Sequence, residues 1–162
     1  MAKFVSKRIV RSGICKFNEE PEAIFPLLCP VREKDWVVGW NYEMIYSESG
    51  YNENGCTFKS EFSGEDAIWT VITYDREKYD LEAVIFVKDM LVVKFLIRLG
   101  ENEDGTTNAL ISQTFTSISE KGSHSICENT EELYSKYLAG LEKSMNYYLE
   151  NGKMISALKF HH

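Results

Sequence analysis

The residues that could carry out chemistry in this sequence are few, and each also has an ordinary structural role. Asp35 lies beside Trp36. Two further charged residues, Arg32 and Glu33, come just before it. Apolar surroundings would raise the pKa of the Asp35 carboxyl and suit it to acid–base chemistry, whereas a surface ion pair is the more common role of such a trio. The sequence leaves both interpretations open and favours the ion pair.

A second group of polar residues is expected among apolar neighbours. Gln113 shares a strand face with apolar residues such as Phe115, so a buried amide there would need a hydrogen-bond partner. It could orient an oxygen of a ligand, or it could bond a tyrosine of the last helix. The tyrosines of that helix could each point a hydroxyl at the same space while their rings pack, and they are Tyr134, Tyr137 and Tyr148.

The remaining reactive residue types show no catalytic or metal-binding pattern. His124 has serine neighbours in a polar link, but no third group is positioned to complete a nucleophilic triad. The four cysteines are scattered without a Cys-x-x-Cys pair, which predicts buried free thiols: Cys15, Cys29, Cys56 and Cys127. The sequence contains no phosphate-binding loop, dinucleotide fingerprint or HExxH motif, so no cofactor and no metal are expected.

Composition restricts the class of protein. The 162 residues fit one domain, expected at 1–155 with a tail at 156–162, and the net charge of -7 weighs against nucleic-acid binding. No apolar run approaches the roughly 20 residues that span a bilayer, and the first residues lack the apolar stretch of a secretion signal, which predicts a cytoplasmic protein. The oligomeric state is open between monomer and homodimer. His161 and His162 could be native residues or the remnant of a tag, and the sequence favours neither interpretation.

The chemistry-bearing residues must be positioned by a long series of strands. An opening strand is expected over Phe4–Phe17, with Gly13 as a candidate bulge. Asn18 is typical of a helix cap, and one or two short helices should follow, limited by Pro26 and Pro30. After a structured loop over 31–40, alternating patterns predict six strands, at Tyr42–Glu48, Cys56–Phe62, Ala67–Tyr74, Leu81–Lys88, Leu91–Leu99 and Thr107–Ile118.

The last long helix is predicted over Asn129–Asn151, with Asn129 and Glu132 as a capping box and Gly152 as its stop. One side carries an apolar stripe at three- and four-residue spacing: Tyr134, Tyr137, Leu138, Leu141, Met145, Tyr148 and Leu149. Only this helix has the length and the stripe to cover the dry face of such a sheet. The predicted fold is therefore α+β, with a curved seven-stranded antiparallel sheet wrapped around a long C-terminal helix and two short helices after the first strand.

Four stretches carry a resemblance to a known family: PLLCPVREKDWVVGW, YSESGYNENGCTF, IWTVITYD and DGTTNALISQTFTSISEKG. Together with the order of elements, they resemble the START-like and Bet v 1-like (SRPBCC) superfamily, in particular its polyketide cyclase/dehydrase and lipid-transport-like branch. The resemblance implies a helix-grip fold with a cavity between sheet and helix that takes sterols, lipids, polyketides or other hydrophobic molecules. A curved sheet that diverges from a straight helix leaves such a space on physical grounds as well.

Ten residues are candidates for ligand binding, and the aromatic ones could line the cavity or fill it: Trp36, Trp40, Tyr42, Trp69, Phe86, Gln113, Phe115, Tyr134, Tyr137 and Leu138. Within the helix, Leu141, Met145 and Leu149 are expected to fasten it to the sheet, while Tyr134, Tyr137 and Leu138 cover the pocket. The leading prediction is a protein that binds a small hydrophobic or amphipathic molecule. Two alternatives remain, a cyclase or dehydratase that uses the same cavity and a protein-interaction module like the activators of Hsp90.

Overall fold

The computed structural model describes residues 3–160, so the two interpretations of His161 and His162 fall outside the described residues. Seven strands form one antiparallel sheet in the order β1-β7-β6-β5-β4-β3-β2, which leaves β1 and β2 at its edges. The predicted fold class is confirmed. The strands are β1 (Arg8–Phe17), β2 (Tyr42–Tyr46), β3 (Thr57–Phe62), β4 (Glu65–Asp75), β5 (Asp80–Val87), β6 (Leu91–Glu101) and β7 (Thr107–Ser117).

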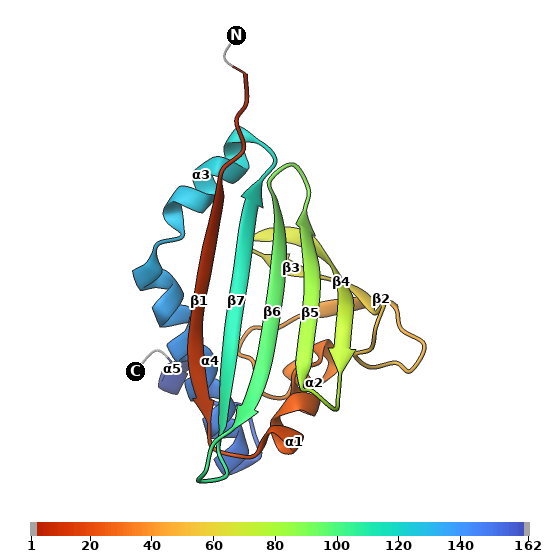
Figure 1. Cartoon of the computed structure of the whole chain (residues 1–162), viewed down its shortest axis with the longest axis vertical. Coiled ribbons are helices and arrows are strands. Elements are labelled where there is room, and N and C mark those ends of the chain that lie inside the picture. The colour runs from red at the N-terminus through yellow and green to blue at the C-terminus, as the bar shows by residue number, and fades with distance from the viewer. Residues whose placement is uncertain (1–2, 161–162) are drawn as a thin grey trace.

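The helices fall into two groups. Between β1 and β2 lie α1 (Pro21–Ile24), the 3-10 helix η1 (Phe25–Leu27) and α2 (Pro30–Glu33). After β7 come α3 (Glu120–Glu128), α4 (Glu131–Asn151) and α5 (Ala157–Phe160). Figure 1 shows α3 and α4 running along the β1 side of the sheet, while α1 and α2 close its lower end. The space between sheet and α4 is therefore bounded by elements from both groups.

The long helix begins later than the sequence predicts. Its N-cap is Thr130, whose hydroxyl accepts a hydrogen bond from the Leu133 amide at 3.2 Å, so the predicted capping box at Asn129 is wrong. The predicted stop is correct, since Gly152 adopts φ 69° and its amide bonds the Tyr148 carbonyl. The polar link before the helix is itself helical and forms α3, because Ser119 caps it and Ile126 is buried.

Alternation along the strands separates a dry face from a wet one. On β6 the alternating residues Leu91, Val93, Phe95, Ile97 and Leu99 are all buried. The outward residues Lys94 and Arg98 form ion pairs with Glu82 (3.1 Å) and Asp80 (3.5 Å) on β5. Register shifts in β2 and β4 mark irregularities of the bulge type, which bend strands and help the sheet to curve.

Gly13 has a role different from the predicted bulge. The register between β1 and β7 is continuous through Gly13, so no residue is inserted there. Instead, a β-carbon at this position would overlap the Leu138 side chain of α4. The glycine therefore lets the helix approach the sheet closely, and Leu138 fastens the helix rather than covering the pocket as predicted.

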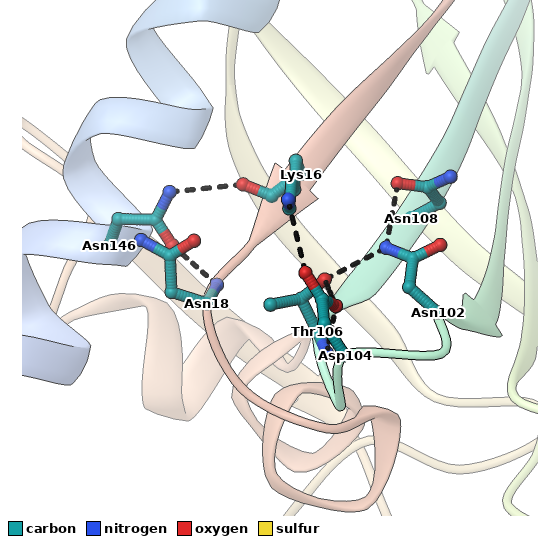
Figure 2. Close-up of polar contacts among 7 residues, drawn as sticks. All are labelled: Lys16, Asn18, Asn102, Asp104, Thr106, Asn108 and Asn146. Carbon is teal, nitrogen blue, oxygen red and sulfur yellow. Dashed lines mark hydrogen bonds and ion pairs between the residues drawn. The ribbon is translucent and has the colours of Figure 1, made fainter.

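Polar side chains of α4 hold the free edge of β1, as Figure 2 shows for Asn146. The Asn146 amide donates to the Lys16 carbonyl at 3.0 Å, and its oxygen accepts from the Asn18 amide at 2.8 Å. One turn earlier, the Glu142 carboxylate accepts from the Lys16 amide. The Lys16 ammonium in turn reaches Asp104 in the β6–β7 turn at 3.5 Å. These bonds satisfy backbone groups of an edge strand and fix the position of α4 over the sheet.

Candidate functional site

A cavity of about 470 Å³ lies between the inner face of the sheet and α4. The sheet contributes mainly aromatic and aliphatic walls, among them Phe58, Trp69, Phe95, Ile97, Ile111 and Phe115. From α4 come Leu133, Tyr134, Tyr137 and Leu141. The α2 helix and the turn after it contribute Pro30, Glu33, Trp36, Val37 and Trp40. A space of this volume suits a ligand of small-molecule size.

Trp69 on β4 is the centre of an aromatic cluster in the sheet wall. Its ring stacks on Phe58 with centroids 5.4 Å apart and meets Phe95 edge-on at 5.9 Å. Trp40 also contacts it edge-on at 6.2 Å, and the indole N–H of Trp40 donates to the Pro30 carbonyl at 2.8 Å. The indole of Trp36 donates to the Leu27 carbonyl at 2.9 Å. The two loop tryptophans are thus seated by hydrogen bonds and also border the cavity.

Seven of the ten predicted ligand-binding residues line the cavity: Trp36, Trp40, Trp69, Gln113, Phe115, Tyr134 and Tyr137. The other three do not. Phe86 points to the outer face and is 44% exposed, because it follows Glu82 and Val84 in the outward series of β5. Tyr42 stacks behind Trp40 at 6.5 Å, and Leu138 packs at Gly13. Leu141 borders the cavity instead of only fastening the helix as predicted.

Gln113 keeps its amide unpaired inside the cavity wall. The residue is only 4% exposed, and no hydrogen bond links its side chain to any residue within 3–160. Of the two alternatives that the sequence left open, the bond to a helix tyrosine is not formed. The fully buried unpaired polar atoms of the described residues are the indole N–H of Trp69 and the Tyr134 hydroxyl, whereas the Gln113 amide keeps accessible surface at the cavity, where polar atoms of a ligand can bond to it.

Glu33 lines the cavity, whereas the sequence pointed to its neighbour Asp35 as the candidate acid–base group. The Glu33 carboxyl has neither a hydrogen bond nor an ion pair with any residue that the structure describes, and burial raises its pKa to about 8. The side chain keeps some accessible surface, which fits a group that faces a cavity rather than bulk water. Asp35, in contrast, forms a surface ion pair with Arg32 at 3.1 Å. Pro30, Glu33, Val37 and Trp40 recur at three- and four-residue spacing, but α2 ends at Glu33, so this spacing alone does not identify Glu33 as a cavity residue.

The two helix tyrosines at the cavity stack on each other with ring centroids 5.5 Å apart. The Tyr134 hydroxyl is buried without a hydrogen-bond partner, as is the indole N–H of Trp69. Burial raises the pKa of both Tyr134 and Tyr137 well above the usual range. Tyr137 as a whole is 45% exposed and also lines the cavity. Both phenols are neutral at physiological pH.

The other reactive residue types lie apart from the cavity. His124 is exposed on α3 and pairs with Glu128 at 3.3 Å. Three cysteines are buried free thiols as predicted, but Cys127 is exposed. Among residues 3–160, no group of three or more histidine, cysteine or acidic residues is placed to hold a metal ion. No helix in the same range is both long and apolar enough to cross a membrane.

A seven-stranded sheet that grips a long helix around a cavity defines the helix-grip fold of Bet v 1-like proteins, so the predicted resemblance is confirmed for the fold. No family profile matches the sequence, and no curated protein matches it either.

Solved structures match almost the whole chain. Norcoclaurine synthase from Thalictrum flavum, in complex with dopamine and hydroxybenzaldehyde, has a TM-score of 0.67 and 13% identity, over 91% of this chain and 90% of that chain. Major latex-like protein 151 from Panax ginseng has a TM-score of 0.62 and 8% identity, over 90% and 98%. Ara h 8.0201 has a TM-score of 0.60 and 14% identity, over 90% and 100%.

Proposed function

We propose that this protein binds a small, largely apolar molecule in the cavity between the sheet and α4. The observation that carries the proposal is the Gln113 amide, which is 4% exposed and has no partner within residues 3–160, in the wall of a cavity of about 470 Å³. An amide that faces the cavity without a protein partner is available to bond polar atoms of a ligand. The Gln113 amide and the Glu33 carboxyl can orient the polar atoms of a ligand, and the aromatic walls supply apolar contact.

The structural neighbours support a ligand of this kind. The norcoclaurine synthase structure contains two small aromatic molecules, dopamine and hydroxybenzaldehyde. The cavity of this chain is walled by aromatic rings and has room for a molecule of one or two rings. We therefore expect a compact aromatic or amphipathic ligand.

A larger side chain in the cavity wall should weaken binding. Ala83 on β5 is buried and borders the cavity, so Ala83→Phe would place a ring in the space that a ligand needs. We expect the affinity for the neutral fluorescent probe N-phenyl-1-naphthylamine to fall at least about tenfold, because the probe loses apolar contact area. Fluorescence titration of the purified protein measures this.

The matched control is Val84→Phe on the neighbouring residue, which points away from the cavity to the outer face. It should bind the probe as the unmodified protein does. Circular dichroism must first show that both variants are folded. If the unmodified protein does not bind the probe at all, or if Ala83→Phe binds it equally well, the cavity is not a ligand site of this kind.

Acid–base catalysis in the same cavity is a second candidate, and Glu33 favours it. A carboxyl with a pKa of about 8 can give and take protons near neutral pH, and Gln113 and Tyr137 line the same cavity. If Glu33 transfers protons, Glu33→Gln should lower the rate of condensation of dopamine with hydroxybenzaldehyde at least about 100-fold. Product formation by mass spectrometry measures this, with Asp35→Asn as the control. If the unmodified protein gives only the rate of the uncatalysed reaction, this candidate is wrong.

The third alternative, a protein-interaction module, finds less support. Exposed apolar residues do occur on the outer sheet face, such as Ile72 and Phe86. Ion pairs between β5 and β6 and between Lys59 and Glu43 interrupt that face. The cavity remains the feature that needs a functional explanation.

A further inference from the structure

The cavity is lined by acidic side chains and by no basic one among the described residues. Glu33 contributes a carboxyl, and Glu61 on β3 contributes another at the exposed rim. In the part of the chain that the structure describes, no lysine, arginine or histidine lines the cavity. Buried carboxylates in proteins are normally paired with a cation or a set of hydrogen-bond donors. Glu33 has neither within residues 3–160, so its carboxyl is free to pair with a cationic group of a ligand.

We propose that the cavity selects ligands that carry a protonated amine, which Glu33 binds as an ion pair while the aromatic walls hold the apolar body. This inference rests on the proposed binding function and specifies the class of ligand. A cavity of this kind would prefer amines to neutral hydrophobic molecules of the same size.

The chemistry around Glu33 fits an ammonium group. An ammonium carries three hydrogen-bond donors. Several cavity-lining side chains have acceptor oxygens that bond to nothing among the described residues, and Glu33, Gln113 and Tyr137 are among them. Aromatic faces attract cations, and Trp36, Trp40 and Trp69 border the same space. The net charge of -7 also favours the approach of a cation over that of an anion.

Binding of an ammonium should release a proton. Burial raises the pKa of Glu33 to about 8, so in the empty cavity the carboxyl holds its proton at pH 7. When the ammonium pairs with Glu33, the carboxyl loses that proton to the solvent and the carboxylate–ammonium pair remains. The other titratable groups that line the cavity are Tyr134 and Tyr137 on α4, which stay neutral because burial raises their pKa, and Glu61 at the rim.

Tyramine and tyrosol provide a matched pair of probes. They share a phenol ring on a two-carbon chain and differ only in the end group, which is an ammonium in tyramine and a hydroxyl in tyrosol. Isothermal titration calorimetry at pH 7 compares them on the unmodified protein, Glu33→Gln and Asp35→Asn. The last variant removes a surface carboxylate two residues from Glu33 and outside the cavity lining.

The unmodified protein and Asp35→Asn should bind tyramine about tenfold more tightly than tyrosol, because a charged hydrogen bond is stronger than a neutral one. In Glu33→Gln this preference should disappear. Titrations in phosphate and in Tris, which differ in ionisation enthalpy, should show that tyramine releases up to one proton and tyrosol releases none.

Each failure has a separate meaning. If tyrosol binds as tightly as tyramine, or if the preference survives in Glu33→Gln, the amine inference is wrong and the binding function stands. If N-phenyl-1-naphthylamine binds but neither phenol displaces it, the amine inference is again wrong. If none of the three probes binds, the binding function fails and the inference fails with it.

Discussion

Replacing Glu33 with glutamine is expected to stabilise the empty protein, and to do so more at pH 8 than at pH 5. Burial raises the pKa of Glu33 from 4.5 to about 8, and its carboxyl has no partner within residues 3–160. The folded protein therefore holds a proton that the unfolded chain has released across this pH range. As a result, the free energy of unfolding of the unmodified protein falls as the pH rises from about 4.5 to about 8.

The size of the effect follows from the shift in pKa. Each pH unit between about 4.5 and about 8 lowers the free energy of unfolding by at most about 1.4 kcal/mol. The upper limit for the whole range is therefore near 5 kcal/mol. Because the side chain keeps some accessible surface in the cavity, we expect a smaller value of about 2 kcal/mol. Glu33→Gln removes this pH-dependent cost and should raise the melting temperature at pH 8 by about 5 °C.

Thermal denaturation between pH 5 and pH 8 tests this prediction. The control is Asp35→Asn, which removes an exposed carboxylate of the Arg32 ion pair and should leave the pH profile of the unmodified protein in place. If Glu33→Gln loses stability with pH as steeply as the unmodified protein does, Glu33 is not the source of the slope. A stabilising substitution in a ligand site would also show that the residue is kept for binding rather than for folding.

Replacing Gly122 with alanine is expected to destabilise the protein strongly. Gly122 lies in the first turn of α3, and a β-carbon there would overlap the Met90 carbonyl in the β5–β6 turn. Neither the turn at Met90 nor the first turn of α3 can move freely. The Met90 carbonyl accepts from the Ile118 amide at 2.8 Å, and the Gly122 amide donates to the Ser119 hydroxyl at 3.0 Å. We expect a loss of about 3 kcal/mol, or about 10 °C in melting temperature.

Gly100→Ala is the matched control for this substitution. Gly100 is exposed near the end of β6, and a β-carbon there meets no atom within 4 Å. Its stability should stay within about 0.5 kcal/mol of the unmodified protein. Chemical denaturation of both variants measures the difference. Equal stability of the two variants would mean that α3 shifts away from the turn at little cost.

The sequence predicted those features that depend on local periodicity. Alternation along Leu91–Leu99 correctly separated the buried face of β6 from the charged one. Three- and four-residue spacing located the long helix, and Gly152 located its end because only a residue tolerant of φ 69° suits that stop. The same alternation placed Gln113 and Phe115 on one face of their strand, and both line the cavity.

Other features follow from contacts between segments that are distant in sequence. Gly13 belongs to a regular strand, and its small size matters only because Leu138 lies above it. Phe86 resembles a lining aromatic in composition but belongs to the outward series of β5. The end of β1 is held by Asn146, 128 residues away from Asn18. No local pattern encodes such pairings, since they depend on how the sheet curves around the helix.

Glu33 shows the difference most clearly. From the sequence alone it is one charged residue among several near Trp36, and nothing in its type separates it from Asp35. The fold directs Asp35 to a surface ion pair with Arg32 and places Glu33 in the cavity wall without a partner. The sequence by itself determined a sheet, a helix and an apolar space between them, because burial patterns are local. Only the tertiary structure decided which carboxyl faces that space, because the electrostatic surroundings of a group are set by the segments packed around it.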